Sequence, residues 1–462
     1  MRVKISALWA GVFLLLASSM TTHGESRWIN TSGGTLDWTT SGNWSGAFPP
    51  GFGDDVRITN DFSIATTIIN AGRSNAANNT ATINFLAISN GLASTPITVI
   101  QSPNLNWISR FGVQVGKNAT LILTTNATFG ADNNMTFNLR PGGQAGTLIL
   151  SNAAATSGFS SFLIAGAGAT TNPIVNSGTI MFKPNGGQLV SMNYGQTLAF
   201  TNGTQGTVVM NGTGTGAFIG NFGSQNRPLV NSGSIFVNAG TLRIDSRDAF
   251  SRGGFQNSST GYIQVDAGGT FEIRRTTNAW VNGPAVTNFG GVYLNGGNVV
   301  ALDLDQGGTA LRTNVARIIA NSGTIGGNGT VYASVNSLSG AIVTPGLSLG
   351  TLNVAGNVTI GSNSTLSIEL GLLPGQNDLL AVSSNLTLNA DSILNITGGA
   401  VGNIYTVATA FAVSGIFGTV TPSYTVNYDP TDITIQFVPE PSTLLLVGIG
   451  LVGMFSLRRR RS

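Results

Sequence analysis

The sequence predicts an all-β fold, a right-handed parallel β-helix or β-solenoid, and three observations predict it. Only 8 % of the residues are charged, against about 25 % in ordinary globular chains, and 63 residues are glycine. Apolar and polar residues alternate over short runs that break at Gly, Asn or Asp, as strands and turns do. Similar units also recur along the chain, and units that cannot bury a face alone must stack on each other.

Two kinds of unit recur. Asn-Ser-Gly precedes a strand-like run at 176–180, 231–235 and 321–325, and a Gly-Thr-Leu unit at 240–244 returns in variant form at 350–354. The spacing of these units is irregular, and we expect coils of roughly 18–25 residues. A jelly roll or a propeller is the alternative architecture, but the repeated units favour the solenoid.

Residues 1–24 have the three parts of a secretory signal peptide. Arg2 and Lys4 form a basic n-region, residues 7–17 form an apolar core, and small residues precede a cleavage point before Glu25. The apolar core is short for a membrane-spanning helix. The sequence therefore predicts an exported protein whose leader is removed.

The predicted mature chain contains neither cysteine nor histidine, because the chain has no cysteine and its single histidine, His23, lies in the leader. Disulfides, thiolate nucleophiles and metal sites built from these residues are therefore excluded. Gly346-Leu-Ser-Leu-Gly350 fits a Gly-x-Ser-x-Gly nucleophile elbow, but that elbow needs a general-base histidine. We expect no catalytic residue, no metal and no cofactor.

The basic excess of the chain lies at its two ends. The formal net charge is +3, with 21 basic and 18 acidic residues. Six basic residues belong to the ends, and these are Arg2, Lys4, Arg458, Arg459, Arg460 and Arg461. Subtracting those six leaves 15 basic against 18 acidic residues in 25–457, a net charge of −3. The body therefore lacks the basic surface that phosphate neutralisation needs, and we expect no nucleic-acid partner.

The segment 438–462 combines three features in a fixed order. It begins with a short proline-rich box, which is Val438, Pro439, Glu440 and Pro441. An apolar run at 443–457 follows, and the arginine cluster 458–461 comes next. As a helix the run would span about 22 Å, short of the ~30 Å hydrocarbon core, but arginine side chains can snorkel and the bilayer can thin.

This order resembles the PEP-CTERM sorting signal of Gram-negative bacteria that make exopolysaccharide. The resemblance implies an exosortase-type sorting enzyme as a partner, and an ordinary tail-anchor helix is the alternative. The positive-inside rule keeps the arginines cytoplasmic and the body outside the inner membrane. We therefore expect a transient anchor through a short transmembrane helix, followed by a location at the cell surface or outside the cell.

The first part of the predicted body, 25–60, is rich in tryptophan. Trp28, Trp38 and Trp44 occur there with Asp54-Asp55, in a pattern similar to the start of many PEP-CTERM proteins with β-helical bodies. A solenoid exposes its first coil as an open edge, so bulky aromatic residues can cap it. A sugar-stacking platform is the alternative function for these tryptophans.

The last part of the predicted body, 340–437, resembles the final coils of autotransporter-type passenger β-helices. The resemblance rests on the segments 344–352, 354–360 and 378–382. The chain ends in the anchor rather than in an autotransporter barrel, so self-secretion is not implied. The expected organisation is a leader at 1–24, a solenoid body at 25–437 and a sorting segment at 438–462.

One cluster of charged side chains, at 243–275, stands out against the low charge of the body, and Asp303 and Asp305 follow it. A possible glycan or ion patch consists of Asp245, Asp248, Asp266, Glu272, Arg274, Asp303 and Asp305. Ion pairing on one face of the solenoid is the simpler interpretation. A polysaccharide groove or a lyase-like site is the sharper one, although the base would then have to be an arginine.

These features predict an exported, surface-associated structural or adhesive solenoid, sorted through its tail and linked to exopolysaccharide or the cell envelope. We expect it not to be an enzyme. The alternative is a carbohydrate-active β-helix enzyme, a polysaccharide lyase or hydrolase, and convergence of the acidic residues with Arg274 in a deep groove would favour it. A passive filament or an ice-contact surface, which requires flat rows of threonine, is the third alternative.

Overall fold

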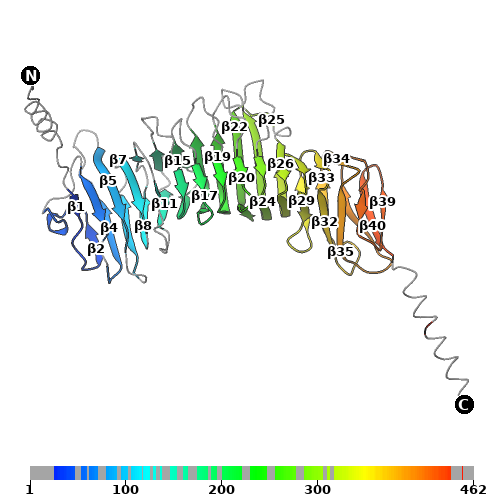
Figure 1. Cartoon of the computed structure of the whole chain (residues 1–462), viewed down its shortest axis with the longest axis horizontal. Coiled ribbons are helices and arrows are strands. Elements are labelled where there is room, and N and C mark those ends of the chain that lie inside the picture. Colours follow the sequence, from blue (N-terminus) through cyan, green and yellow to red (C-terminus); the bar gives the residue numbers. More distant parts are fainter. Residues whose placement is uncertain are drawn as a thin grey trace, which may run out of the picture.

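A computed structural model describes the protein as an elongated stack of parallel strands (Figure 1). The described residues are 25–46, 54–59, 62–70, 80–90, 95–101, 106–116, 118–124, 128–131, 136–137, 146–152, 160–164, 174–185, 189–194, 200–220, 229–246, 255–276, 286–304, 310–312, 317–438 and Gly450. The body runs from β1 at one end to β40 at the other. The prediction of an all-β solenoid is therefore confirmed, while the predicted leader and the apolar run 443–457 lie outside the described residues, apart from Gly450.

Each central coil contributes one strand segment to each of three faces. The first face is an 11-stranded parallel sheet of β10 (Thr136–Phe137), β13 (Ile174–Asn176), β16 (Phe200–Asn202), β18 (Leu229–Asn231), β20 (Phe255–Asn257), β23 (Val286–Asn288), β26 (Arg317–Asn321), β28 (Ser334–Leu338), β31 (Val358–Ile360), β34 (Asn385–Leu388) and β37 (Ala412–Ser414).

The other two faces are joined into one network by long strands that bend at a corner. The strands that lie on the second face are β2 (Gly34–Asp37), β4 (Thr66–Asn70), β6 (Ile97–Gln101), β8 (Ala119–Leu123), β11 (Thr147–Asn152), β14 (Thr179–Pro184), β21 (Tyr262–Asp266), β29 (Ile342–Pro345), β32 (Thr365–Leu370), β35 (Ile393–Gly398) and β38 (Thr419–Val420). Those on the third face are β9 (Thr128–Ala131), β12 (Ser160–Ile164), β15 (Leu189–Tyr194), β22 (Gly269–Thr276), β30 (Thr351–Val354), β33 (Leu379–Val382) and β36 (Ile404–Thr409). The long strands that join these two faces are β17 (Thr207–Gly220), β19 (Ser234–Ser246), β24 (Gly291–Leu304) and β27 (Thr324–Tyr332). Two more long strands, β5 (Thr80–Ile88) and β7 (Asn106–Val115), begin in the row of β9 on the third face, and the last residues of β5 pair with β3.

The coils of the central body are longer than the sequence predicts. Side chains that bond from one coil to the next are 26, 29, 26 and 31 residues apart along the chain. The shorter estimate is wrong for these coils, because three strand segments and the chain that joins them take 26–31 residues. This variable coil length also explains why no fixed repeat is visible in the sequence.

The core is a set of apolar rows that run along the rod. Strand residues alternate between buried and half-buried, as in Tyr262–Asp266, so every second side chain points inward. Ile180 lies under Val208, Ile235 and Ile263 in successive coils, and all four are at most 1 % exposed. Each coil thus buries its inward side chains against the coils on both sides, so a coil has no complete core of its own.

A buried asparagine ladder runs inside the corner that follows the first face. Its members each end a strand of that face, are 0 % exposed, and are Asn176, Asn202, Asn231, Asn257 and Asn288. Each amide nitrogen Nδ2 donates to the Oδ1 of the next asparagine at 2.7–2.8 Å. Each Nδ2 also donates to a main-chain carbonyl of the following coil, as Asn231 does to Tyr262 at 3.4 Å. Neighbouring coils therefore supply much of the hydrogen bonding of these buried amides, and short bonds within a coil, such as that from Asn202 Nδ2 to the carbonyl of Gly206, supply the rest.

The ladder differs in part from the predicted repeat units. Asn176 and Asn231 belong to both, but Asn321 does not join the ladder. The register pairs Asn288 with Ala320, one residue before Asn321, and then pairs Ala320 with Ser337. The ladder therefore ends at Asn288, and apolar or small side chains fill the same row beyond it.

The N-terminal end carries β1 (Glu25–Arg27), β3 (Asp55–Ile58) and the short 3-10 helix Ser41–Asn43. Three tryptophans fill it, Trp28, Trp38 and Trp44, and they are 0, 2 and 1 % exposed. Their rings meet edge to face, with centroids 5.0 and 4.6 Å apart. Buried rings offer no face to a sugar, so the sugar-stacking alternative for these three residues is wrong.

The C-terminal end closes with antiparallel strands. β40 (Asp432–Phe437) pairs antiparallel with β36 and with β39 (Tyr424–Tyr428), whereas the coils before it pair in parallel. A further antiparallel contact joins β24 to β25 (Ala310–Arg312). The strand β40 covers the open edge that β36 would otherwise present, and an uncovered edge is a site of aggregation.

Candidate functional site

The centre of the predicted charged patch is Glu272 on β22. Arg243 lies beside it on β19, and its Nε is 2.8 Å from Glu272 Oε2. Arg274 approaches from the same strand, with its Nε 2.7 Å from Glu272 Oε1. Glu272 is only 7 % exposed. Both oxygens of this carboxylate are thus engaged by guanidinium groups within the fold, which leaves it poorly placed to reach a substrate proton.

The other residues of the predicted patch are distributed over several places. Asp245 is buried on β19 and lies next to Arg274 in the register. Asp303 lies on β24, where the register pairs it with Arg275 of β22. Asp248 and Asp305 lie outside the described residues. The structure therefore gathers Asp245, Glu272 and Arg274 on neighbouring strands but does not show the whole set in one groove.

Asp266 belongs to a different set of contacts, at the end of β21. Its Oδ1 accepts hydrogen bonds from Gln264 Nε2 at 2.8 Å and from Asn295 Nδ2 at 3.1 Å. The hydroxyl of Tyr262 donates to Gln264 Oε1 at 2.8 Å. Burial raises the pKa of Tyr262, and the neighbouring Tyr293 and Asp266 raise it further. The hydroxyl therefore stays protonated at neutral pH and keeps its donor role.

Aromatic rings lie on the outer surface directly beside this polar set. The ring centroid of Tyr262 is 5.9 Å from that of Phe236 and 5.4 Å from that of Tyr293, and all three side chains are half-buried. Gly291 makes room for Tyr293, because a Cβ at Gly291 would lie 2.5 Å from its ring. We call Phe236, Tyr262, Gln264, Asp266, Tyr293 and Asn295 the aromatic patch.

Sequence reasoning selected only Asp266 from the aromatic patch. The aromatic members lie about one coil apart along the chain, on β19, β21 and β24, and only the register brings them together. The signal that could have found them is an aromatic residue at an outward position of consecutive coils. That signal requires the coil length, which the irregular repeats conceal.

An uninterrupted row of threonines lies on the outside of the second face. Its members stand next to one another in the register, are half-buried, and are Thr67, Thr98, Thr120, Thr147, Thr179 and Thr207. The adjacent outward row is aliphatic and consists of Ile69, Ile100, Ile122, Ile149, Met181 and Val209. Hydroxyl and methyl groups thus form two parallel lines along the rod.

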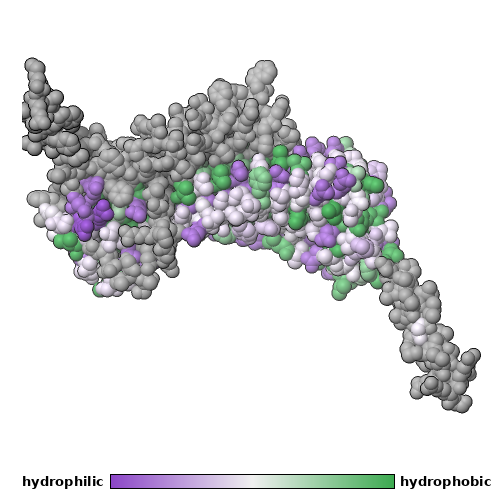
Figure 2. Space-filling view, in the orientation of Figure 1, coloured by the Kyte–Doolittle hydropathy of each residue, from purple (hydrophilic) through white to green (hydrophobic). Residues whose placement is uncertain are grey.

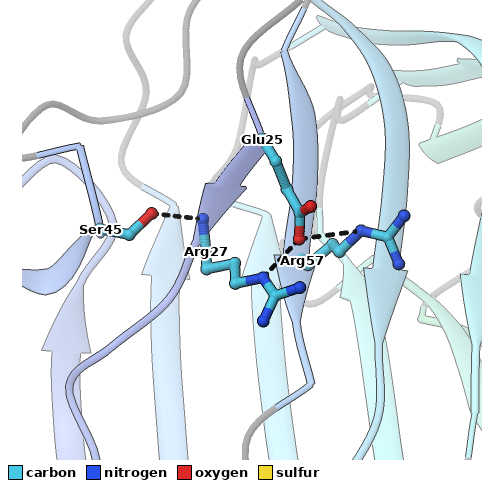
Figure 3. A network of polar contacts seen from close by, with 4 residues as sticks. All are labelled: Glu25, Arg27, Ser45 and Arg57. Carbon is cyan, nitrogen blue, oxygen red and sulfur yellow. Dashed lines mark hydrogen bonds and ion pairs between the residues drawn. The ribbon is translucent and has the colours of Figure 1, made fainter.

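The N-terminal strands carry a small exposed ion-pair network (Figure 3). Glu25 accepts from Arg27, and the Nε of Arg57 on β3 lies 3.3 Å from Glu25 Oε1. The main-chain N–H of Arg27 donates to Ser45 Oγ at 3.1 Å. The hydrogen bond from Arg27 and the charge of Arg57 hold the pKa of Glu25 below its usual value. Figure 2 shows a hydrophilic cluster at this end of the body.

The Gly346–Gly350 segment is a turn between β29 and β30, and Ser348 is exposed in it. Asp378 fixes this turn, because its Oδ1 accepts from the N–H of Gly350 at 3.0 Å and its Oδ2 accepts from the N–H of Glu369 at 2.9 Å. Burial raises the pKa of Asp378 to about 6. The strand that follows the turn is not the helix a nucleophile elbow requires.

Two of the three segments that resemble autotransporter passengers, 344–352 and 378–382, are therefore in direct contact through Asp378. The carboxylate links two successive coils, because β30 pairs with β33. This contact has a structural purpose, since the main-chain donors of a corner need acceptors when they are buried.

The chain leaves the body at the end of β40. The N–H of Val438 donates to the carbonyl of Ser423 at 2.9 Å, which holds the first residue after the strand. Pro439, Glu440, Pro441 and the arginine cluster 458–461 lie outside the described residues. Among the residues that are described, no helix is both long and apolar enough to cross a membrane.

Comparison with protein families finds one match, at the end of the chain. Residues 437–461 match the PEP-CTERM protein-sorting motif. The chain carries a PEP-CTERM sorting signal. It is therefore an exported protein with a membrane-anchored C-terminal signal that an exosortase handles. The PEP-CTERM match begins at Phe437, the last residue of β40, so the sorting signal follows the solenoid without a linker. No curated protein matches the chain.

Proposed function

We propose that this PEP-CTERM protein is a structural or adhesive rod of the cell surface that binds exopolysaccharide through the aromatic patch. The observation that carries the proposal is the pairing of three outward rings with amide and carboxylate groups on the same surface. Sugars offer both an apolar C–H face, which can stack on a ring, and hydroxyls, which bind such polar groups.

The charge of the aromatic patch selects the kind of polysaccharide. It carries one carboxylate, Asp266, and none of its other five members is charged. A polyanionic chain such as a polyuronate would be repelled by this carboxylate, whereas a neutral chain would not. The expected ligand is therefore a neutral, hydroxyl-rich polysaccharide.

A non-enzymatic role is the second part of the proposal. The two carboxylate oxygens of Glu272 pair with Arg243 and Arg274. The carboxylate of Asp266 accepts hydrogen bonds from Gln264 and Asn295 in a separate set of contacts. Glycoside hydrolysis needs two carboxyl groups that face the same bond. The contacts of these two carboxylates favour a stabilising role over an acid/base role.

The test is retention of the detergent-purified full chain on insoluble neutral β-glucan and on alginate. We expect retention on the glucan alone, and roughly tenfold weaker retention when Tyr262→Ala and Tyr293→Ala are combined. Tyr332→Ala is the matched control, because Tyr332 is an exposed tyrosine outside the aromatic patch. Equal retention of the double variant and the parent would refute the role of these rings.

The threonine row favours ice contact as a second candidate function. Regularly spaced hydroxyl and methyl groups along a rigid rod can order water at the ~4.8 Å spacing of the coils. The test is thermal hysteresis of the full chain in dilute solution. A clear freezing gap that Thr120→Lys and Thr147→Lys abolish would replace the polysaccharide proposal, whereas no gap would remove this candidate.

A further inference from the structure

Exposed apolar side chains gather around the point where the chain leaves the body. Leu372 and Leu373 lie in the loop between β32 and β33, Val401 precedes β36, Ile404 begins it, and Val438 follows β40. These five side chains are 43–73 % exposed. We call them the apolar rim. Figure 2 shows hydrophobic residues on the surface of this end.

Hydrogen bonds hold the members of the apolar rim next to one another. Ile404 pairs with Gln436 on β40, and the N–H of Gly402, beside Val401, donates to the carbonyl of Phe437 at 3.3 Å. Asn403 Nδ2 donates to the carbonyl of Leu372 at 3.1 Å. The loop between β32 and β33 is also held by Tyr405 of β36, whose hydroxyl donates to the carbonyl of Gly371 at 2.9 Å. The rim therefore surrounds the end of β40.

The composition of the two loops differs from that of ordinary exposed loops. Residues 371–376 read Gly-Leu-Leu-Pro-Gly-Gln and residues 399–404 read Gly-Ala-Val-Gly-Asn-Ile, and the one charged residue of the first loop, Asp378, is buried. A group of exposed apolar side chains on loops without exposed charge is typical of a surface that is covered in the functional state.

The length of chain beyond the body identifies what covers the rim. Only residues 439–442 separate Val438 from the apolar run 443–457 of the sorting signal. Four extended residues span at most about 14 Å. While the signal is anchored, the end of β40 must therefore lie within that distance of the hydrocarbon boundary.

We propose that the apolar rim rests in the interface of the lipid bilayer while the PEP-CTERM signal is anchored, so that the membrane holds the C-terminal end of the rod. The proposal rests on the anchored state of the sorted protein. Leucine and valine side chains on a small rigid surface can enter the headgroup region without crossing the bilayer. Cleavage of the signal would remove the tether and leave only this weak contact, which favours release.

The test uses the absence of cysteine in the chain, which makes a single introduced cysteine the only labelling site. The full chain is reconstituted in phosphatidylcholine vesicles with an environment-sensitive fluorophore on Leu373→Cys or Ile404→Cys. We expect quenching by spin-labelled lipids to be at least roughly twofold stronger than in the controls.

The controls are Phe411→Cys and Ile64→Cys. Phe411 is 78 % exposed, but it lies near Asp432, at the opposite end of β40. At ~3.3 Å per residue it is about 17–20 Å from the rim. Ile64 is exposed near the N-terminal end of the rod. Each labelled variant must also show the unfolding transition of the parent.

The possible results separate the claims. Flotation with vesicles together with equal quenching at 404 and 411 overturns the rim contact but leaves the anchor intact. Failure to float with vesicles refutes the anchored state and the contact together. A fluorescence shift that grows with the protein-to-lipid ratio, without lipid quenching, means that a second copy covers the rim and also overturns the proposal.

Discussion

At the scale of single residues, the buried asparagines show how polar groups are satisfied in a stack that has little charge. Asn231 accepts from Asn202 and donates to Asn257 and to the carbonyl of Tyr262. These three bonds join Asn231 to the coil before it and the coil after it. Losing this side chain removes a buried hydrogen-bond partner from both neighbours.

We predict that Asn231→Ala lowers the free energy of unfolding by about 2–4 kcal/mol, because it leaves the Nδ2 of Asn202 and the Oδ1 of Asn257 without their ladder partners. Urea unfolding followed by circular dichroism measures the change. Asn238→Ala is the control, since Asn238 is exposed on β19, and it should change the stability by less than about 0.5 kcal/mol. Equal effects of the two variants would contradict the structural role of the ladder.

A second residue-scale prediction concerns Asp378. Its pKa is about 6 in the folded chain and near 3.8 in the unfolded chain, so the folded state binds more protons between these values. Stability should therefore fall as the pH rises from about 4 to about 6, by about 2 kcal/mol for the coils that Asp378 joins.

Asp378→Asn should abolish this step, because an amide side chain does not titrate in this range, although its Nδ2 cannot accept the second main-chain bond and the overall stability should fall. Asp391→Asn, which changes an exposed aspartate, should leave the step in place. Unfolding temperatures from pH 4 to pH 7 measure both. A stability that rises over this range in the parent chain would be the opposite of the expected sign.

At the scale of elements, the corners decide how the coils fit together. Gly233 follows β18, and a Cβ there would lie 2.1 Å from the carbonyl oxygen of Gly206 and 2.2 Å from that of Gly203. The corner of one coil thus lies directly on the main chain of the coil before it. The glycine in the Asn-Ser-Gly unit is explained by this close approach.

We predict that Gly233→Ala destabilises the chain by about 2–4 kcal/mol, because the clash is with main-chain atoms that cannot move alone. Gly46→Ala is the control, since a Cβ there meets nothing within 4 Å. Urea unfolding compares the two variants. If Gly233→Ala were as stable as Gly46→Ala, the packing of successive corners would differ from the one described.

The elements also show what the sequence could predict and what it could not. Alternating runs predicted the strands, and Asn-Ser-Gly predicted the strands that begin after Asn176, Asn231 and Asn321. The Asn-Ser-Gly motif could not reveal that Asn202, Asn257 and Asn288 join Asn176 and Asn231 in one ladder. These three asparagines stand in different local sequences and at variable spacing. Register is set by corner length and packing between coils, which short motifs do not encode.

The same reason explains the limits of the candidate site prediction. The sequence places Asp266 and Glu272 six residues apart, but they make separate contacts, because a turn lies between β21 and β22. It also separates Phe236, Tyr262 and Tyr293, which the register unites. The sorting signal was predictable in full, since its order depends on the chain itself rather than on tertiary contacts.

At the scale of the whole molecule, the two ends of the rod differ, because only the C-terminal end continues into the sorting signal. The N-terminal end is closed by three buried tryptophans, and the C-terminal end passes directly into the PEP-CTERM signal. A rod attached at one end extends its outer rows and its aromatic patch away from the membrane. This arrangement suits contact with a surrounding polysaccharide more than turnover of a soluble substrate.

Our central claim is that the solenoid binds polysaccharide without cleaving it, and release of sugar ends tests it most directly. The detergent-purified full chain is incubated with neutral β-glucan, and bound protein and new reducing ends are measured in the same sample. We predict that protein is retained while the number of reducing ends stays at the level of the protein-free control. A steady release of reducing or unsaturated ends that Glu272→Gln abolishes would contradict the claim and identify a polysaccharide hydrolase or lyase.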